Sequence, residues 1–428
     1  MKTLKDAPTT LMFHAEMLPP IADSVGDAVV QSGPPLQPHG ELNSYETFLE
    51  SRPPAFETYA VDEILSLAPT APQLHLHIVH LSATECIPML RQARQNGIHI
   101  TAETCFHYLG LASDDIQDGD TRHKCCPPIR SQTNQDRLWD EICDPDGCIK
   151  TIVSDHSPCT PELKLLPPHL QTVYQEGPRP TMQHLDSGID VTLPKEGKTE
   201  VMNVDVNTTA ATTTVVADMT PAAPTATLPA MHPDDSGIDV RLPSESARAS
   251  PDSTASMPID QSAAPSTSPS PAPPTTQTPP QEIKQGDFFA AWGGISSVGL
   301  GLPILYTTSA LRASRGLSAP SILDIVRMCS QATAQQVGLS HCKGGLRAGL
   351  DADIAVFDDE EVWTLRAGDM RWKNRCSPWE GHTFRGRVKE TWVRGRRVFA
   401  LDGGDYGSGN GFGEGGPWGR AIVERRTA

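Results

Sequence analysis

The sequence is short of aromatic side chains, of basic residues relative to acidic ones, and of long apolar runs. Phe, Trp and Tyr make up 5% of the 428 residues, whereas Pro and Gly number 39 and 34, so less of the chain can form a packed core than its length suggests. The net charge of −17 disfavours nucleic acid and anionic membranes as partners, because neither attracts an acidic surface. No stretch approaches the ~18 apolar residues of a membrane helix, and the first residues lack the apolar segment of a signal peptide. The ten cysteines include no CxxC pair, which is typical of buried thiols in a reducing compartment, so we expect a cytoplasmic protein.

Composition also divides the chain into globular and low-complexity parts. Residues 1–165 and 285–400 alternate apolar runs with polar segments and are predicted to fold. Residues 166–284 are rich in Pro, Ser, Thr and Ala; we expect disorder there, because such a segment buries too little apolar area to offset its ordering entropy. The sequence DSGIDV occurs twice in this insert, which indicates either a local duplication or a pair of short motifs for a partner. Residues 401–428 are predicted to be a flexible Gly-rich tail.

Strand and helix patterns alternate in the globular parts. Short apolar runs predict strands over 11–16, 74–82, 99–105 and 151–157, and helical spacing predicts helices over 56–68, 134–143 and 321–337. Ser82, with Glu85 three residues later, has the capping-box pattern that predicts the start of a further helix. Repeated strand–helix units predict an α/β fold with a parallel sheet. Residues 343–400 contain short strand patterns punctuated by Gly, which predict a small β domain.

Three of the predicted strands end in a side chain that can bind a metal ion. His14 ends the first strand, His80 the second and Asp155 the last. In a (β/α)8 barrel the catalytic groups lie at the carboxyl ends of the strands, and two imidazoles with a carboxylate are ligands that suit zinc. The pair His75 and His77 offers a second metal-binding interpretation, but it lies early in its strand, away from this end.

Several segments resemble the cyclic amidohydrolases of the amidohydrolase superfamily, and among them the allantoinases. The matching segments, in chain order, are FHAEM, LHIVHLSATE, ETCFHYL, KCCPPIR, VSDHSPCTPELK, AWGGISS and KGGLRAGLDADIAVFD. They cover nearly all of the globular sequence. The resemblance places the 166–284 insert in a surface loop near the mouth of the active site.

The resemblance implies which residues bind metal. His14 resembles the histidine that ends strand five of the family barrel, His80 the one that ends strand six, and Asp155 the aspartate that ends strand eight. The implied fold is therefore a partial (β/α)8 metallo-dependent hydrolase barrel with strands five to eight, in residues 1–165 and 285–342. The HxH of strand one and the carboxylated lysine of strand four have no counterpart in this sequence. We accordingly expect a chain that lacks the N-terminal half of the barrel and binds two zinc ions or fewer.

The resemblance also implies how substrate is held and converted. The backbone around Cys126, Gly293 and Gly294 would hold the substrate ring, Glu16 would orient His14, and His156 would support the metal ligands or face the substrate. Asp155 would carry a proton as the catalytic residue.

The function implied is zinc-dependent hydrolysis of allantoin to allantoate, a step of purine catabolism. Two alternatives stay open: a non-catalytic truncated homologue or scaffold, and a dihydropyrimidinase- or hydantoinase-type cyclic amidase. The expected partner is a small cyclic ureide, with no nucleic acid and no membrane. A homo-oligomer, and a short-motif partner for the DSGIDV repeats, also stay open.

Overall fold

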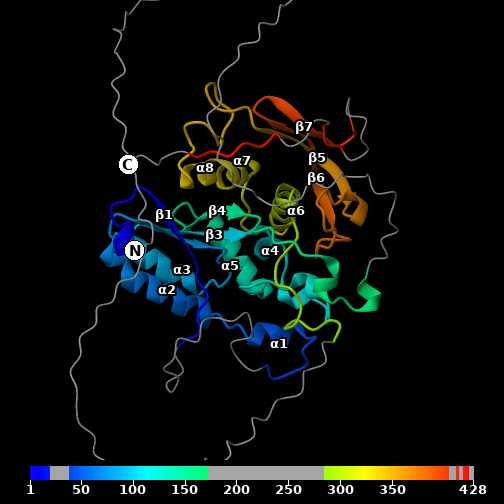
Figure 1. Cartoon of the computed structure of the whole chain (residues 1–428), viewed down its shortest axis with the longest axis horizontal. Helices are drawn as coiled ribbons and strands as arrows, with labels where there is room; N and C mark the ends of the chain where they lie inside the picture. Colours follow the sequence, from blue (N-terminus) through cyan, green and yellow to red (C-terminus); the bar gives the residue numbers. More distant parts are fainter. Residues whose placement is uncertain (20–37, 172–283, 404–410, 414–417, 424–428) are drawn as a thin grey trace, which may run out of the picture. The chain divides into compact units, whose positions relative to one another are not determined.

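Figure 1 shows the computed structural model of the chain, which describes residues 1–19, 38–171, 284–403, 411–413 and 418–423. These residues belong to one compact unit, formed by Met1–Gly177 and Thr278–Ala428. Residues 172–283 lie outside the described residues; they hold both DSGIDV repeats and nearly all of the segment predicted to be disordered. Parts of the predicted Gly-rich tail also lie outside them. Within the described ranges, no helix combines the length and the apolar character that crossing a membrane requires.

The helices and strands are labelled in chain order. They are β1 Thr10–His14, α1 Tyr45–Glu50, α2 Ala55–Leu67, β2 His75–Val79, α3 Cys86–Gln95, β3 Ile100–Cys105, α4 Phe106–Gly110, α5 Gln132–Cys143, β4 Ile149–Val153, α6 Gly301–Ser314, α7 Ile322–Val326, α8 Ala332–Gln336, β5 Ile354–Thr364, β6 Thr383–Val393 and β7 Arg396–Ala400.

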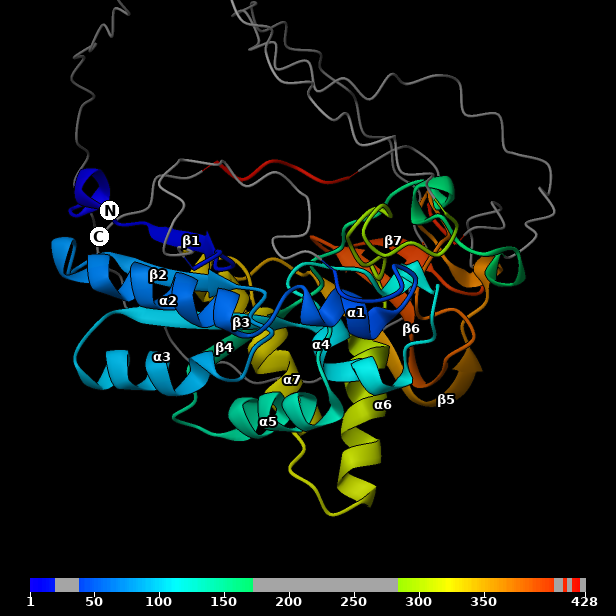
Figure 2. The same cartoon turned by 90° about the horizontal axis from the view of Figure 1, so that it is seen from below.

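Strands β1 to β4 form one sheet in sequence order, and each neighbouring pair is parallel. This confirms the predicted α/β fold with a parallel sheet. Leu76, Ile78 and Ile152 are buried in its core, as the apolar runs require. Helices α2 and α3 pack against each other along the sheet (Figure 2). Because all four strands run the same way, their carboxyl ends meet at one edge of the sheet.

Side chains on one face of the sheet are polar and bonded to one another. Thr101 Oγ1 lies 2.8 Å from His75 Nε2 and 2.7 Å from His77 Nδ1. His77 Nε2 lies 3.2 Å from a carboxylate oxygen of Glu103, and His75 Nδ1 lies 3.0 Å from Thr10 Oγ1. The HLH triplet is therefore part of a hydrogen-bonded network that crosses β1, β2 and β3.

The predicted helices are present, but the helix predicted over 321–337 is interrupted and the predicted N-cap of α3 is wrong. The predicted helix over 321–337 is α7 and α8 joined by a π-helical turn at Arg327–Gln331, and Ser321 caps it. The predicted capping by Ser82 is wrong, because α3 begins at Cys86 with Glu85 as its N-cap. The backbone amide of Ser82 instead donates to a carboxylate oxygen of Glu57, and this long-range contact replaces the local one.

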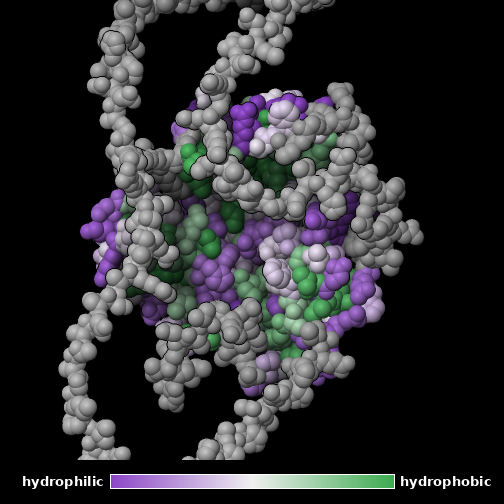
Figure 3. All heavy atoms as spheres, in the orientation of Figure 1, coloured by the Kyte–Doolittle hydropathy of each residue, from purple (hydrophilic) through white to green (hydrophobic). Residues whose placement is uncertain are grey.

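The C-terminal part forms a second sheet, as the strand patterns of residues 343–400 predict. Strands β5, β6 and β7 pair antiparallel in sequence order, and α6 packs on β6. Some large apolar residues are exposed, Leu323 and Leu346 among them. In the coloured part of the face shown in Figure 3, hydrophobic and hydrophilic residues are intermixed.

Candidate metal centre

The carboxyl ends of β1 and β2 bring two histidines together. His14 Nδ1 and His80 Nε2 lie 2.9 Å apart and share a hydrogen bond, and the rings meet edge to face at 4.7 Å between centroids. Their positions follow from the parallel register, which sets His14 beside Val79, the residue before His80. The structure thus joins two predicted site residues that are 66 positions apart in the sequence.

His80 and Asp155 both have left-handed backbone conformations just beyond their strands. Their φ angles are +39° and +42°, a region that side-chain-bearing residues rarely adopt. Such conformations cost about 1–3 kcal/mol each and tend to occur at functional sites. The pKa of His80 is lowered, first by burial and then by the neighbouring His14, while the charge of Asp155 acts in the opposite direction. The lowered pKa favours the neutral imidazole, which is the form that binds metal.

Glu16 lies two residues beyond the end of β1 and faces His14. Its carboxylate Oε2 is 3.6 Å from His14 Nε2 and accepts a 2.8 Å hydrogen bond from Arg52 Nη1. Burial raises the pKa of Glu16, but the contacts with His14 and Arg52 outweigh it and the pKa is lowered overall. The arrangement places a buried negative charge beside the His14 ring.

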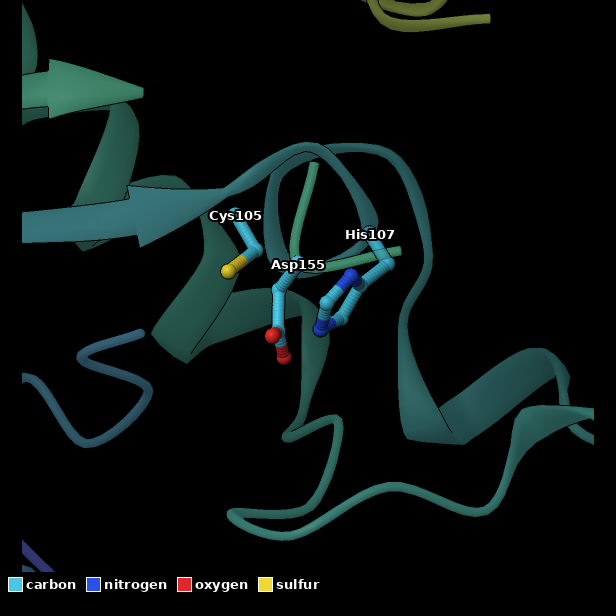
Figure 4. A group of neighbouring side chains, drawn as sticks. All are labelled: Cys105, His107 and Asp155. Carbon is cyan, nitrogen blue, oxygen red and sulfur yellow. The ribbon is translucent and has the colours of Figure 1, made fainter. Parts of the chain in front are cut away.

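Cys105, His107 and Asp155 form a second group at the same edge of the sheet. Cys105 is the last residue of β3, His107 lies in α4, and Asp155 follows β4. One ligand atom from each side chain lies within 4.8 Å of the other two, and the three side chains converge in Figure 4. Two of the three are fully buried, and Asp155 is exposed.

The segment that contains Gly293 and Gly294 is fastened beside Asp155 by two buried lysines. Lys164 Nζ donates to the carbonyl oxygens of Trp292 and Gly294, at 3.0 and 2.7 Å. Lys124 Nζ donates to two carbonyl oxygens a little earlier in the same segment, at 2.9 and 2.6 Å. Four carbonyl groups are thereby turned inward, and burial lowers the pKa of both lysines.

The same segment continues along the loop that follows β4 and is bonded to it. The backbone amide of Ser157 donates to the carbonyl oxygen of Ile295 at 2.9 Å. His156 Nδ1 accepts hydrogen bonds from the backbone amides of Ser297 and Val298, at 3.0 Å each. The His156 ring therefore anchors this loop, and its predicted role, to support the metal ligands or to face the substrate, stays a prediction.

The two predicted substrate-binding glycines differ in how tightly they are packed. A Cβ atom on Gly294 would lie 2.6 Å from Ser157 Oγ, so close packing by itself requires glycine there. A Cβ atom on Gly293 would be 4.0 Å from Cys126 Sγ and no closer than 3.8 Å to any other group, so packing does not require this glycine. Gly293 and Cys126, which are both expected to contact substrate, thus lie close together in two different segments of the chain.

Behind His80, a buried ion pair holds the loop that follows β2. Arg130 Nη2 donates to Glu57 Oε1 at 2.7 Å, and Glu57 Oε2 accepts the backbone amides of Ser82 and Ala83 at 2.9 and 3.0 Å. The loop that carries His80 is thus fixed by a charge on α2.

Sequence reasoning did not assign a site role to Cys105, His107, Glu57 or the two lysines. Cys105 follows the strand-end rule that identified His14 and His80, and the segment ETCFHYL contains both Cys105 and His107, so a signal was present. Glu57 and Lys164 gave no signal in the sequence, because their hydrogen-bond partners lie 25 or more positions away.

The chain is similar in sequence to several known proteins. A family model described as "Amidohydrolase family" matches residues 306–399, from α6 to β7. The allantoinase of Saccharomyces cerevisiae is 30% identical over 93% of this chain and 57% of its own length. The allantoinase of Streptomyces avermitilis is 27% identical over 83% of this chain and 51% of its own length, and "Probable allantoinase 2" of Dictyostelium discoideum is 27% identical over 93% and 54%.

The fold also matches a solved structure. The D-hydantoinase from Bacillus sp. AR9 superposes with a TM-score of 0.50 at 18% identity, over 93% of this chain and 59% of that one. The chain spans about half of the length of the relatives that it matches. The chain is therefore similar to the amidohydrolase family over residues 306–399 and to allantoinases over most of its own length.

Proposed function

We propose that this chain carries the metal-binding strand ends of an enzyme that hydrolyses the ring of allantoin to give allantoate. The observation that carries the proposal is the 2.9 Å approach of His14 and His80, both placed at the carboxyl ends of parallel strands. The allantoinase relatives supply the substrate class. We assign β1 to β4 to strands five to eight of a (β/α)8 barrel, within residues 1–165 and 285–342. Residues 343–400 are assigned to a small β domain, and 166–284 to an insertion in a loop.

The residues at the strand ends fit a metal ion. His80 Nδ1 and Glu16 Oε1 are buried atoms without a hydrogen-bond partner in the described structure, although buried polar atoms are nearly always bonded. Imidazole and carboxylate are ligands that zinc accepts, so we propose zinc at His14, His80 and Asp155. In the described residues His14 and His80 are in contact, but Asp155 does not form a group with them that is close enough to share one ion, so binding would require these side chains to move together. Such an ion, when bound, polarises a carbonyl group and makes water more acidic.

The side chains of this chain would then perform distinct tasks. Asp155 accepts a proton from the attacking water and returns it to the ring nitrogen that leaves when the amide C–N bond breaks, so water is added and no proton is lost. The backbone around Cys126 and Gly293 would hold the ureide ring. Glu16 fixes the orientation of His14 through its own bond to Arg52.

The test measures bound metal and turnover on the same preparations. We expect zinc in the wild type, less zinc in His80→Asn, and wild-type zinc in the control His382→Asn, which changes an exposed histidine next to β6. Allantoin should be hydrolysed in preference to hydantoin and dihydrouracil, and Asp155→Asn should abolish turnover. Equal zinc content in all variants would contradict the assigned ligands, and preference for a six-membered ring would contradict the assigned substrate.

A further inference from the structure

The group formed by Cys105, His107 and Asp155 is not explained by the proposed function. Only Asp155 has a task in that proposal. In the part of the chain that the structure describes, this is the one group of three or more His, Cys, Asp or Glu side chains close enough to hold a common ion. Its ligand atoms lie within 4.8 Å of one another, and they come from β3, α4 and the end of β4.

His107 adds independent support, because its polar atoms are buried and unsatisfied. The side chain is 1% exposed, and neither ring nitrogen has a hydrogen-bond partner in the described structure. A neutral imidazole always has one N–H donor and one acceptor, so both are left without a bond. His77 shows that this is not a general property of buried histidines here: it is 0% exposed, and both of its nitrogens lie within hydrogen-bond distance of Thr101 and Glu103.

The surroundings of these three side chains favour an ion over a water molecule or an empty packing site. Figure 4 shows the His107 ring facing the Asp155 carboxylate, with the Cys105 sulfur on the other side of that carboxylate. The Cys105 thiol is only a weak hydrogen-bond partner, so it does not satisfy the nitrogens of the buried His107 ring. Asp155 is exposed and gives access from solvent.

We propose that Cys105, His107 and Asp155 form a three-ligand site for a thiophilic divalent cation such as Zn²⁺ or Cd²⁺. On binding, a metal–sulfur bond replaces the S–H bond of Cys105, and the proton goes to solvent. Zinc lies ~2.3 Å from a thiolate and ~2.0–2.2 Å from imidazole or carboxylate, so small side-chain rotations would bring all three atoms to one ion. The thiolate distinguishes this site chemically from the His14–His80 pair, because sulfur ligands select soft cations.

The proposal does not depend on the proposed activity, but the two sites share Asp155. A thiophilic cation bound to Cys105 and His107 takes up an oxygen of the carboxylate that the proposed hydrolysis needs. We therefore expect Cd²⁺ to inhibit any turnover of the wild type and to inhibit Cys105→Ser much less.

The decisive measurement is Cd²⁺ titration of the full chain, followed by the thiolate-to-cadmium charge-transfer absorption. We expect about one equivalent to produce the band in the wild type. Cys105→Ser should abolish it, and His107→Phe, which keeps the ring contact with Tyr108 and removes both nitrogens, should weaken binding. Since loss of a group that merely supports a ligand costs about 10–100-fold in affinity, loss of the ligand itself should cost at least about 100-fold.

Two control variants separate this site from Cd²⁺ binding at another cysteine or at the His14–His80 pair. Cys148→Ser changes another fully buried cysteine and should leave the band unchanged. His14→Asn removes a ligand of the proposed catalytic centre and should also leave it unchanged, so failure of one proposal is distinguishable from failure of the other. A band that survives in Cys105→Ser, or that disappears equally in Cys148→Ser, would overturn the assignment. If a variant does not fold, zinc-edge X-ray absorption of the wild type decides, because a spectrum with no sulfur at ~2.3 Å excludes Cys105 as a ligand.

Discussion

The buried ion pair behind His80 gives the most informative test of how this fold supports its site. Glu57 is 1% exposed and serves three donors: Arg130 on one oxygen, and the amides of Ser82 and Ala83 on the other. We predict that Glu57→Gln destabilises the chain strongly. The glutamine carbonyl can still accept backbone amides, but Arg130 is left buried without a negative partner.

The expected loss follows from these contacts. Removing one member of a buried ion pair costs about 3–5 kcal/mol, because the remaining charge is uncompensated. Arg130→Met should cost less, since the Glu57 carboxylate keeps its two amide donors and hydrogen bonds to charged groups are worth about 1.5–3 kcal/mol each. Asp62→Asn, an exposed carboxylate on the same helix, should change stability by no more than about 0.5 kcal/mol.

Equilibrium urea unfolding measures all three differences. The midpoint should fall with an unchanged slope, because the surface exposed on unfolding stays the same. Binding of zinc should weaken in Glu57→Gln, since the freed loop begins directly after His80. A loss below about 1 kcal/mol for Glu57→Gln, or an equal loss for Arg130→Met, would refute the idea that this charge fixes the loop.

Three further predictions concern the loop and the acid stability of the chain. Gly294→Ala should destabilise the fold by more than about 1 kcal/mol, because its Cβ would lie 2.6 Å from Ser157 Oγ and its φ is +141°. Gly293→Ala should be tolerated, because its Cβ would lie no closer than 3.8 Å to any neighbouring atom. Thermal unfolding of the two variants checks this. Lys164→Met leaves two buried carbonyl groups without their donor, which should lower the free energy of unfolding by about 1–3 kcal/mol. The same change should raise the KM for allantoin more than it lowers kcat. Unchanged kinetics would show that the loop does not need this lysine. Burial raises the pKa of Asp120, but hydrogen bonds from basic side chains two and three residues along outweigh it and hold that pKa well below its usual value. Its stabilising contribution is therefore full above the usual carboxyl pKa and is lost as the pH falls through the lowered one, so Asp120→Asn should be less stable than the wild type at pH 7 and the difference should shrink in strong acid; a pH series of urea midpoints checks this.

Local patterns were sufficient to predict the elements and the edge where the site lies. The run that begins at Leu74 forms a strand, because apolar residues alternate there with the histidines of the polar network. The parallel order of the strands could be predicted from the repeated strand–helix units. His14 and His80 could be predicted as neighbours since parallel strands bring their carboxyl ends together. Ser82 shows the limit of such patterns: its local cap motif was displaced by a charge on another helix.

The class of fold, the succession of strands and helices, and the two histidines at adjoining strand ends could all be inferred from the order of amino acids, because each depends on periodicity within some ten residues. How those strand ends are held could be learned only from the folded chain. The two lysines that turn four carbonyl groups inward bind partners 128 to 167 positions away, and the meeting of Cys105, His107 and Asp155 depends on where β3, α4 and β4 end in space. Such contacts leave no periodic trace in the sequence, because folding alone brings these side chains within bonding distance.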